Sequence, residues 1–114
     1  MTQEQEELLL KDLCARLPYG VILNCCEIVS EPLTLISYKG LVNNDYDIDE
    51  VKPYLFPLSS MTEEQKDIFG KLWWNTHGLN MAMHAIDYLN KHHFDYRGLI
   101  PMGLAIDATG LNIY

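Results

Sequence analysis

The chain has 114 residues, of which 48% are hydrophobic and 21% charged, a composition typical of one ordinary globular domain and not of a disordered chain. Its formal net charge is −8. Because nucleic-acid affinity comes mainly from lysine and arginine, this charge disfavours direct binding of DNA or RNA. No apolar run approaches the roughly 20 residues that a membrane span needs, so no membrane association is expected.

The N-terminal segment and the cysteines favour a cytoplasmic location. Residues 1–7 are acidic, whereas a secretory signal begins with basic residues and continues with apolar ones. The chain has three cysteines, two of them adjacent, and this is not the pattern of a disulfide framework. We therefore expect the protein to lie in a reducing cytoplasm.

The first predicted element is an amphipathic helix that begins at Thr2 and ends near Arg16. Thr2 and Gln5 have the spacing of a capping box, in which each residue's side chain binds the other's backbone N–H. Pro18 cannot continue the helix. One face is apolar, with residues at helical spacing: Leu9, Leu10, Leu13, Cys14 and Leu17.

The next stretch, residues 18–58, is rich in β-formers. A strand is predicted over residues 20–29, a turn at 30–32 and a second strand over 33–39, which together would form an antiparallel hairpin. A short strand at 46–48, a single helical turn at 49–51 and a strand at 54–56 follow. These elements predict a small, curled antiparallel sheet of about three to five strands, for which an SH3-like barrel is one arrangement.

Residues 59–93 are predicted to form two helices. The first opens with a capping box, either Thr62 with Gln65 or Ser60 with Glu63, and runs to about residue 75. Residues 76–78 either break the helix or are carried through it. Apolar residues then recur at helical spacing up to about residue 91, which predicts a helix hairpin whose apolar faces pack on the sheet. These apolar residues are Ile68, Phe69, Leu72 and Trp73 in the first helix and Leu79, Ala82, Met83, Ile86 and Leu89 in the second.

Residues 94–114 form an irregular tail, with a turn at 95–98 and an edge strand near 103–107. The whole chain, residues 1–114, is thus expected to be a single α+β domain with one shared core. It comprises an N-terminal helix, a β-rich half (18–58), a helical half (59–93) and this tail.

Acidic side chains provide the first candidate binding site. Residues 1–58 hold ten acids against four bases, and four of the acids fall in one loop, at Asp45, Asp47, Asp49 and Glu50. This loop lacks the glycine and the final glutamate of the EF-hand calcium loop. It is either a solvated turn or a surface that contacts a basic groove on a partner protein.

A second candidate lies at residues 92–97, where His93, Tyr96 and Arg97 bring together a base, a phenol and a guanidinium. The structural alternative is that these residues bond the end of the preceding helix and pair with a nearby acid. Trp74 is a further candidate, because adjacent tryptophans on a helix cannot both face one core and an exposed tryptophan can anchor a partner.

No catalytic residue, metal ligand or cofactor is assigned. The histidines, at positions 77, 84, 92 and 93, do not have the spacing of ligands to one metal ion. Neither a phosphate-binding loop nor a dinucleotide fingerprint occurs.

Three segments carry a resemblance to a group of proteins: LCARLPYGV at residues 13–21, VKPYLFPLSSMT at 51–62 and HFDYRGLI at 93–100. In these segments the chain resembles small uncharacterised proteins encoded by bacteriophages and prophages of gut bacteria. The resemblance implies a setting in a host cytoplasm and brings no site residues with it. Small acidic phage proteins of this kind often bind host machinery, and anti-defence inhibitors are one such group.

The expected function is therefore a non-enzymatic protein-interaction module, which inhibits a host protein through its acidic surface. The alternative is a small enzyme or ligand-binding domain centred on residues 92–97. The sequence identifies neither the partner nor the oligomeric state.

Overall fold

The computed structural model describes residues 1–25, 29–74 and 79–114. Within these ranges the chain is an α+β fold of four helices and one small mixed sheet of five strands, which confirms the predicted fold class. The molecule is elongated, with extents of 42 × 31 × 24 Å. None of its helices in the described ranges is both long and apolar enough to cross a membrane.

Helix α1 (Gln3–Arg16) forms as the sequence predicts. The Gln5 amide donates to Thr2 Oγ1 over 3.1 Å, and the Thr2 amide donates to Gln5 Oε1 over 3.0 Å, so the predicted capping box is present. A 3-10 turn, η1 (Leu17–Tyr19), ends the helix, and Gly20 takes the left-handed conformation with φ of 64°. The chain then turns directly into the sheet.

The predicted hairpin exists, but its second strand lies earlier in the chain. Strand β1 (Ile22–Cys25) pairs antiparallel with β2 (Val29–Pro32), so the segment expected to turn is itself a strand. The predicted strand over 33–39 is wrong, because this stretch belongs to helix α2 (Leu35–Val42). Thr34 and Ser37 form a capping box that satisfies the first backbone N–H groups of the helix. Residues 26–28, which the predicted first strand included, lie outside the described part of the chain.

The central strand of the sheet is β3 (Val51–Pro57), which contains the predicted strand at 54–56. A 3-10 turn, η2 (Ile48–Glu50), precedes it and corresponds to the predicted helical turn, one residue earlier. The predicted strand at 46–48 is wrong. Asp47 instead caps η2, since its Oδ1 accepts a hydrogen bond of 3.0 Å from the Asp49 amide, and this local bond competes with extended structure.

The sheet has the order β2-β1-β3-β4, and strand β5 (Ile106–Asp107) also pairs with β3. β1 and β3 are antiparallel, but β4 (Phe94–Asp95) and β5 run parallel to β3. The sheet is therefore mixed, and the predicted all-antiparallel sheet is wrong for its second half; the described strands do not close into an SH3-like barrel. The reason is the long connection through α3 and α4, after which the chain comes back beside the end of β3, at Phe56 and Pro57, and pairs with it in the same direction.

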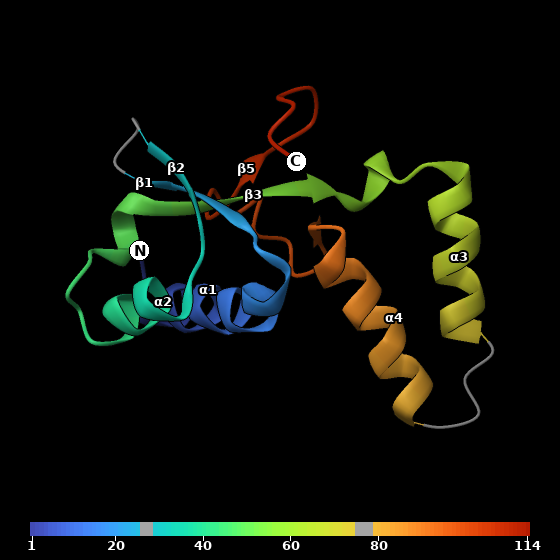
Figure 1. Cartoon of the computed structure of the whole chain (residues 1–114), viewed down its shortest axis with the longest axis horizontal. Coiled ribbons are helices and arrows are strands. Elements are labelled where there is room, and N and C mark those ends of the chain that lie inside the picture. Colours follow the sequence, from blue (N-terminus) through green and yellow to red (C-terminus); the bar gives the residue numbers. More distant parts are fainter. Residues whose placement is uncertain (26–28, 75–78) are drawn as a thin grey trace.

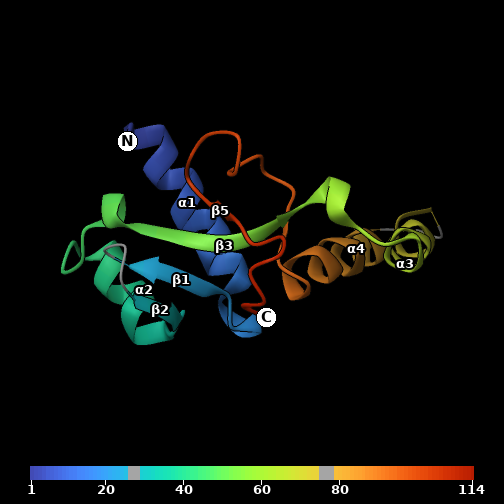
Figure 2. The ribbon, with the colours of Figure 1, turned by 90° about the horizontal axis from the view of Figure 1, so that it is seen from above.

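Helices α1 and α2 lie together on one side of the sheet, as Figures 1 and 2 show. Leu9 and Leu13 of α1 are fully buried there, in a cluster that also contains Leu41 of α2 and Leu55 of β3. The C-terminal tail contributes Leu99, Leu104 and Ala105 to the same core.

The helix hairpin projects beyond the end of the sheet instead of covering it (Figure 1). A 3-10 turn, η3 (Leu58–Ser60), leads into α3 (Glu63–Trp74), and α4 (Leu79–Lys91) packs against α3. Of the two predicted capping boxes, Thr62 with Gln65 forms. Ile68 on the predicted apolar face of α3 is 40% exposed, whereas Leu89, near the end of α4, is buried. No described residue of the hairpin belongs to the main core cluster, and α4 contacts α1 and β4 instead, so the prediction that its apolar faces cover the sheet is wrong. The conformation of 76–78 lies outside the described residues.

Candidate functional site

A hollow of about 400 Å³ lies between β1, α2 and the segment that leads into β3. Carboxylates come to it from three parts of the chain: β2, the turn after α2, and η2. No basic residue is among the described residues that line it. We call it the acidic hollow, and its acids are Glu31, Asp45, Asp47 and Glu50.

The floor of the acidic hollow is apolar. Leu23, Leu41 and Val51 line it and are at the same time members of the buried core. Tyr46 forms part of the wall, because its ring lies against the backbone of α2 at Gly40, in the space that a Cβ atom would occupy. The Asp45 amide donates to the Gly40 carbonyl over 2.8 Å, which ties the acidic turn to the helix. The hollow is thus preformed by packing and backbone hydrogen bonds.

The structure brings together three of the four acids that the sequence singled out. Asp49 does not line the hollow; its Oδ1 lies 3.8 Å from the N-terminal amine of Met1. Glu31 takes its place as the fourth acid of the hollow. Sequence reasoning missed Glu31 because it assigned residues 30–32 to a turn, whereas pairing with β1 places them in a strand at the rim.

Cys25 is the one cysteine among the described residues that line the acidic hollow. Burial, and the nearby negative charge of Glu31, raise the pKa of the Cys25 thiol. Since the thiolate is the reactive form, a raised pKa leaves the thiol protonated at neutral pH. The raised pKa therefore disfavours covalent chemistry at the Cys25 thiol. Nor does any group of three or more potential metal-ligating side chains converge within the described ranges.

The structure divides the second candidate set, His93, Tyr96 and Arg97. Arg97 Nη1 donates to Asp12 Oδ1 and to the Tyr96 hydroxyl, each over 2.8 Å. The Tyr96 hydroxyl in turn donates to Asn90 Oδ1 over 2.8 Å. These bonds join α1, the end of α4 and the turn after β4, which is the structural role that the sequence left open as the alternative for Arg97.

A buried ion pair on α1 completes this network, and sequence reasoning missed it. Asp12 and Arg16 are both 0% exposed, and Arg16 Nε donates to Asp12 Oδ2 over 2.8 Å. Arg16 Nη2 donates to the Phe94 carbonyl over 2.5 Å. Residues 12 and 16 are one helical turn apart and lie on the same side of α1 as Leu9 and Leu13. An acid and a base at this spacing on the apolar side of the helix were the sequence signal for a buried ion pair. We call Asp12, Arg16 and Arg97 the buried ion cluster.

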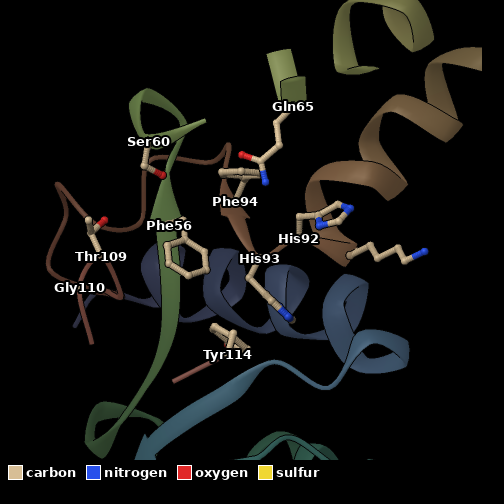
Figure 3. Close-up of a pocket in the computed structure, with 10 residues that line it drawn as sticks. Phe56, Ser60, Gln65, His92, His93, Phe94, Thr109, Gly110 and Tyr114 are labelled. Carbon is tan, nitrogen blue, oxygen red and sulfur yellow. The ribbon is translucent and has the colours of Figure 1, made fainter. Parts of the chain in front are cut away.

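His93 points elsewhere, into a second cavity of about 530 Å³, which we call the aromatic pocket (Figure 3). Its ring stacks on Tyr114, with centroids 3.8 Å apart and planes inclined by 12°. Its backbone φ is 63°, a conformation uncommon for any residue other than glycine, at the point where α4 ends.

The side chain of Trp74, the remaining candidate, and the whole of His77 lie outside the described part of the chain.

Stability at mildly acidic pH tests the surroundings of His93. Burial, helped by the charges of Arg16 and His92, lowers the pKa of His93 to about 4, from 6.5. Below pH 6.5 the unfolded chain therefore binds a proton that the folded chain does not, so stability falls as pH drops from 6.5 toward 4. Between pH 7 and 5 we expect a loss of about 1 kcal/mol from this group, allowing for solvent screening of a half-buried ring.

Urea unfolding of the wild type and of His93→Asn at both pH values measures this effect. Asparagine tolerates a positive φ and does not titrate, so the variant keeps the backbone and removes the proton-binding group. The loss between pH 7 and 5 should shrink in His93→Asn. An equal loss in both proteins would show that His93 has an ordinary pKa.

Comparison with known proteins returns no match: no protein-family model, no curated protein and no solved structure corresponds to this chain.

Proposed function

We propose that this protein is a non-enzymatic protein-interaction module, and that its acidic hollow receives a lysine or arginine side chain of a partner protein. The observation that carries the proposal is the combination of four carboxylates at the rim with an apolar floor. In the phage setting that the sequence resemblance implies, the partner is a host protein. This protein would inhibit the host protein by covering the basic groove that supplies the lysine or arginine.

The chemistry of the hollow suits a long basic side chain. Lysine and arginine have an aliphatic stem and a charged end, and they bury the stem along apolar surface while the charge stays among polar groups. In the hollow the stem would contact Leu41 and Val51, and the charge would meet the carboxylates. The ring of Tyr46, a residue that is 54% exposed, offers a cation–π face at the wall.

Exposed apolar side chains on α2 favour a protein as the owner of that basic side chain. Leu35, Ile36 and Val42 are 55%, 80% and 49% exposed on a helix of eight residues. The same helix lines the acidic hollow through Ser37 and Leu41. Apolar surface next to a charged hollow is typical of protein interfaces, where buried apolar contacts supply affinity and charges supply orientation.

Neutralising two acids of the hollow tests the proposal. Asp45→Asn with Asp47→Asn removes two charges, and asparagine at position 47 can still cap η2. The matched control, Glu64→Gln with Asp87→Asn, removes two charges from exposed positions on α3 and α4, at the other end of the molecule (Figure 1). The probe is a short peptide with one lysine between leucines, followed by the amide resonances of Cys25, Tyr46 and Val51.

We expect the peptide to shift these resonances and to bind about tenfold more weakly to the hollow variant than to the control, at about 1 kcal/mol or less for each exposed charge. Added salt should weaken binding further. A host protein captured from lysate by the wild type should be captured by the control variant and lost from the hollow variant. The proposal is wrong if a peptide with glutamine in place of lysine binds equally well, or if the hollow variant and the control behave alike.

A further inference from the structure

The aromatic pocket is walled by rings that the fold holds in place. The Phe56 ring lies 6.3 Å from that of Phe94 and 5.8 Å from that of Tyr114, measured between centroids. The Tyr114 hydroxyl donates to the Tyr54 carbonyl over 2.8 Å and accepts from the Ile22 amide over 2.7 Å. Because two strands anchor this ring, the wall exists before any ligand enters, which lowers the entropic cost of binding. The volume of about 530 Å³ falls within the range of small-molecule sites.

Polar groups stand across the pocket from these rings. Figure 3 shows Ser60 and Gln65 at one end, with Phe56, His93 and Tyr114 toward the other. Gln65 Oε1 is used by the helix cap, where it accepts from the Thr62 amide, so its Nε2 hydrogens remain for another acceptor. Ser60 Oγ donates to the Pro57 carbonyl, which leaves its lone pairs as acceptors. A few placed polar groups beside aromatic faces are the usual makeup of a small-molecule site.

The charge around the aromatic pocket is opposite to that of the chain as a whole. Lys91 is among its lining residues, and no aspartate or glutamate is among those described. Arg16 lies behind the wall, where its Nη2 donates a hydrogen bond to the carbonyl of Phe94, a lining residue. Arg16 shares the Asp12 carboxylate with Arg97, so two guanidinium groups pair with that one carboxylate. Although the chain has a net charge of −8, the basic groups at and behind the aromatic pocket make it a favourable place for a negative charge.

Two buried polar atoms have no hydrogen-bond partner among the described residues: Nδ1 of His93, which lines the pocket, and Nη1 of Arg16, which is not a lining residue. His93 also holds a strained backbone, which costs on the order of 1 kcal/mol or more for a residue other than glycine. Unpaired buried polar atoms and strain of this kind cluster at binding sites, where the surrounding structure over-determines them.

We infer that the aromatic pocket is a second binding site, for a small planar aromatic molecule that carries a negative charge. The aromatic ring of the ligand would stack against the Phe56 and His93 side of the pocket. Its anionic group would lie near Lys91, and Gln65 Nε2 would donate to an oxygen of the ligand. This inference goes beyond the proposed interaction role and does not depend on it.

Three molecules with the same ring and different charges test the inference: indole-3-acetate, indole-3-acetamide and tryptamine. Amide resonances of His92, His93 and Gly110 report binding at the aromatic pocket, and those of Cys25 and Val51 report the acidic hollow. We expect indole-3-acetate to shift the pocket resonances and to bind about fivefold more tightly than the neutral acetamide. Tryptamine should leave the pocket resonances unshifted.

Lys91→Gln should bring the affinity for indole-3-acetate down to that for the acetamide and leave the acetamide unaffected. The control is Lys52→Gln, an exposed lysine on β3 that does not line the pocket, and it should change neither affinity. His93→Asn, which tolerates the same backbone conformation, should weaken both ligands because it removes the stacking ring. Equal affinities of the three molecules at the pocket, no shift of its resonances by the anion, or anion binding that survives Lys91→Gln unchanged would overturn the inference.

Discussion

Replacing Asp12 with asparagine is expected to lower the free energy of unfolding by about 3–5 kcal/mol, because it breaks a buried ion pair and leaves the charge of Arg16 uncompensated. Arg16 is fully buried and makes its hydrogen bond of 2.8 Å to the carboxylate that the substitution neutralises. Arg97 loses the same partner. Equilibrium unfolding in urea, monitored by circular dichroism, measures the effect.

Arg97→Gln is the matched control for the buried ion cluster. The Arg97 side chain is 17% exposed, and its removal leaves Asp12 paired with Arg16. The cost should be smaller, at about 1–2 kcal/mol. If Asp12→Asn were no more destabilising than Arg97→Gln, the cluster would not be the buried electrostatic centre that the structure describes.

The second large effect is expected at Leu13, where truncation to alanine should cost about 2–5 kcal/mol. Leu13 on α1 is fully buried in the main core. Ile68 on α3 is the matched control, because the sequence places it on an equally apolar helix face, yet it is 40% exposed. Ile68→Ala should cost less than about 1 kcal/mol.

The same unfolding measurement on both variants decides which helix covers the sheet. Because Ile68 is 40% exposed and therefore keeps part of its surface buried, a small loss is compatible with the fold described here. Equal, large losses for Leu13→Ala and Ile68→Ala would instead support the arrangement predicted from sequence, with the helix hairpin packed on the sheet.

The acidic hollow and the aromatic pocket lie in different parts of the molecule. The acidic hollow lies beside α2, whereas the aromatic pocket lies where β3 leads toward α3 and where α4 ends. The two sites share no lining residue, and Figure 1 shows α2 toward one end of the long axis and the end of α4 near its middle. A partner protein at the hollow and a small molecule in the pocket could therefore bind to one copy of the chain at the same time.

The candidate acids were predictable in part because they are close in the sequence. Asp45, Asp47 and Glu50 fall within six residues, and a local cluster survives many choices of fold. Glu31 joins them through strand pairing, and nothing near Glu31 in the sequence shows which loop it will face. In the same way, Asp12 and Arg97 meet from positions 85 residues apart, so only the folded chain brings their charges together.

Local signals decided most of the helices and were ambiguous for the strands. The capping boxes at Thr2 and Thr62 marked α1 and α3 correctly, because a cap is a set of hydrogen bonds between neighbours in the chain. The cap at Thr34 and Ser37 was an equally local signal. It was missed because the residues after it alternate in a way that also suits a strand.

By itself the sequence determined the α+β class, the positions of the first and the last two helices, and the central strand, all of which depend on hydrogen bonds and apolar spacing among near neighbours. The tertiary structure decided the parallel pairing of β4 and β5 with β3, the helix that covers the sheet, and the residues that line the two cavities. These features depend on which apolar faces meet across long stretches of chain. Helices α1 and α3 both have an apolar stripe, but only the stripe of α1 supplies residues to the main core, because the chain turns at Gly20 directly from α1 into the sheet, whereas α3 lies beyond the end of the sheet.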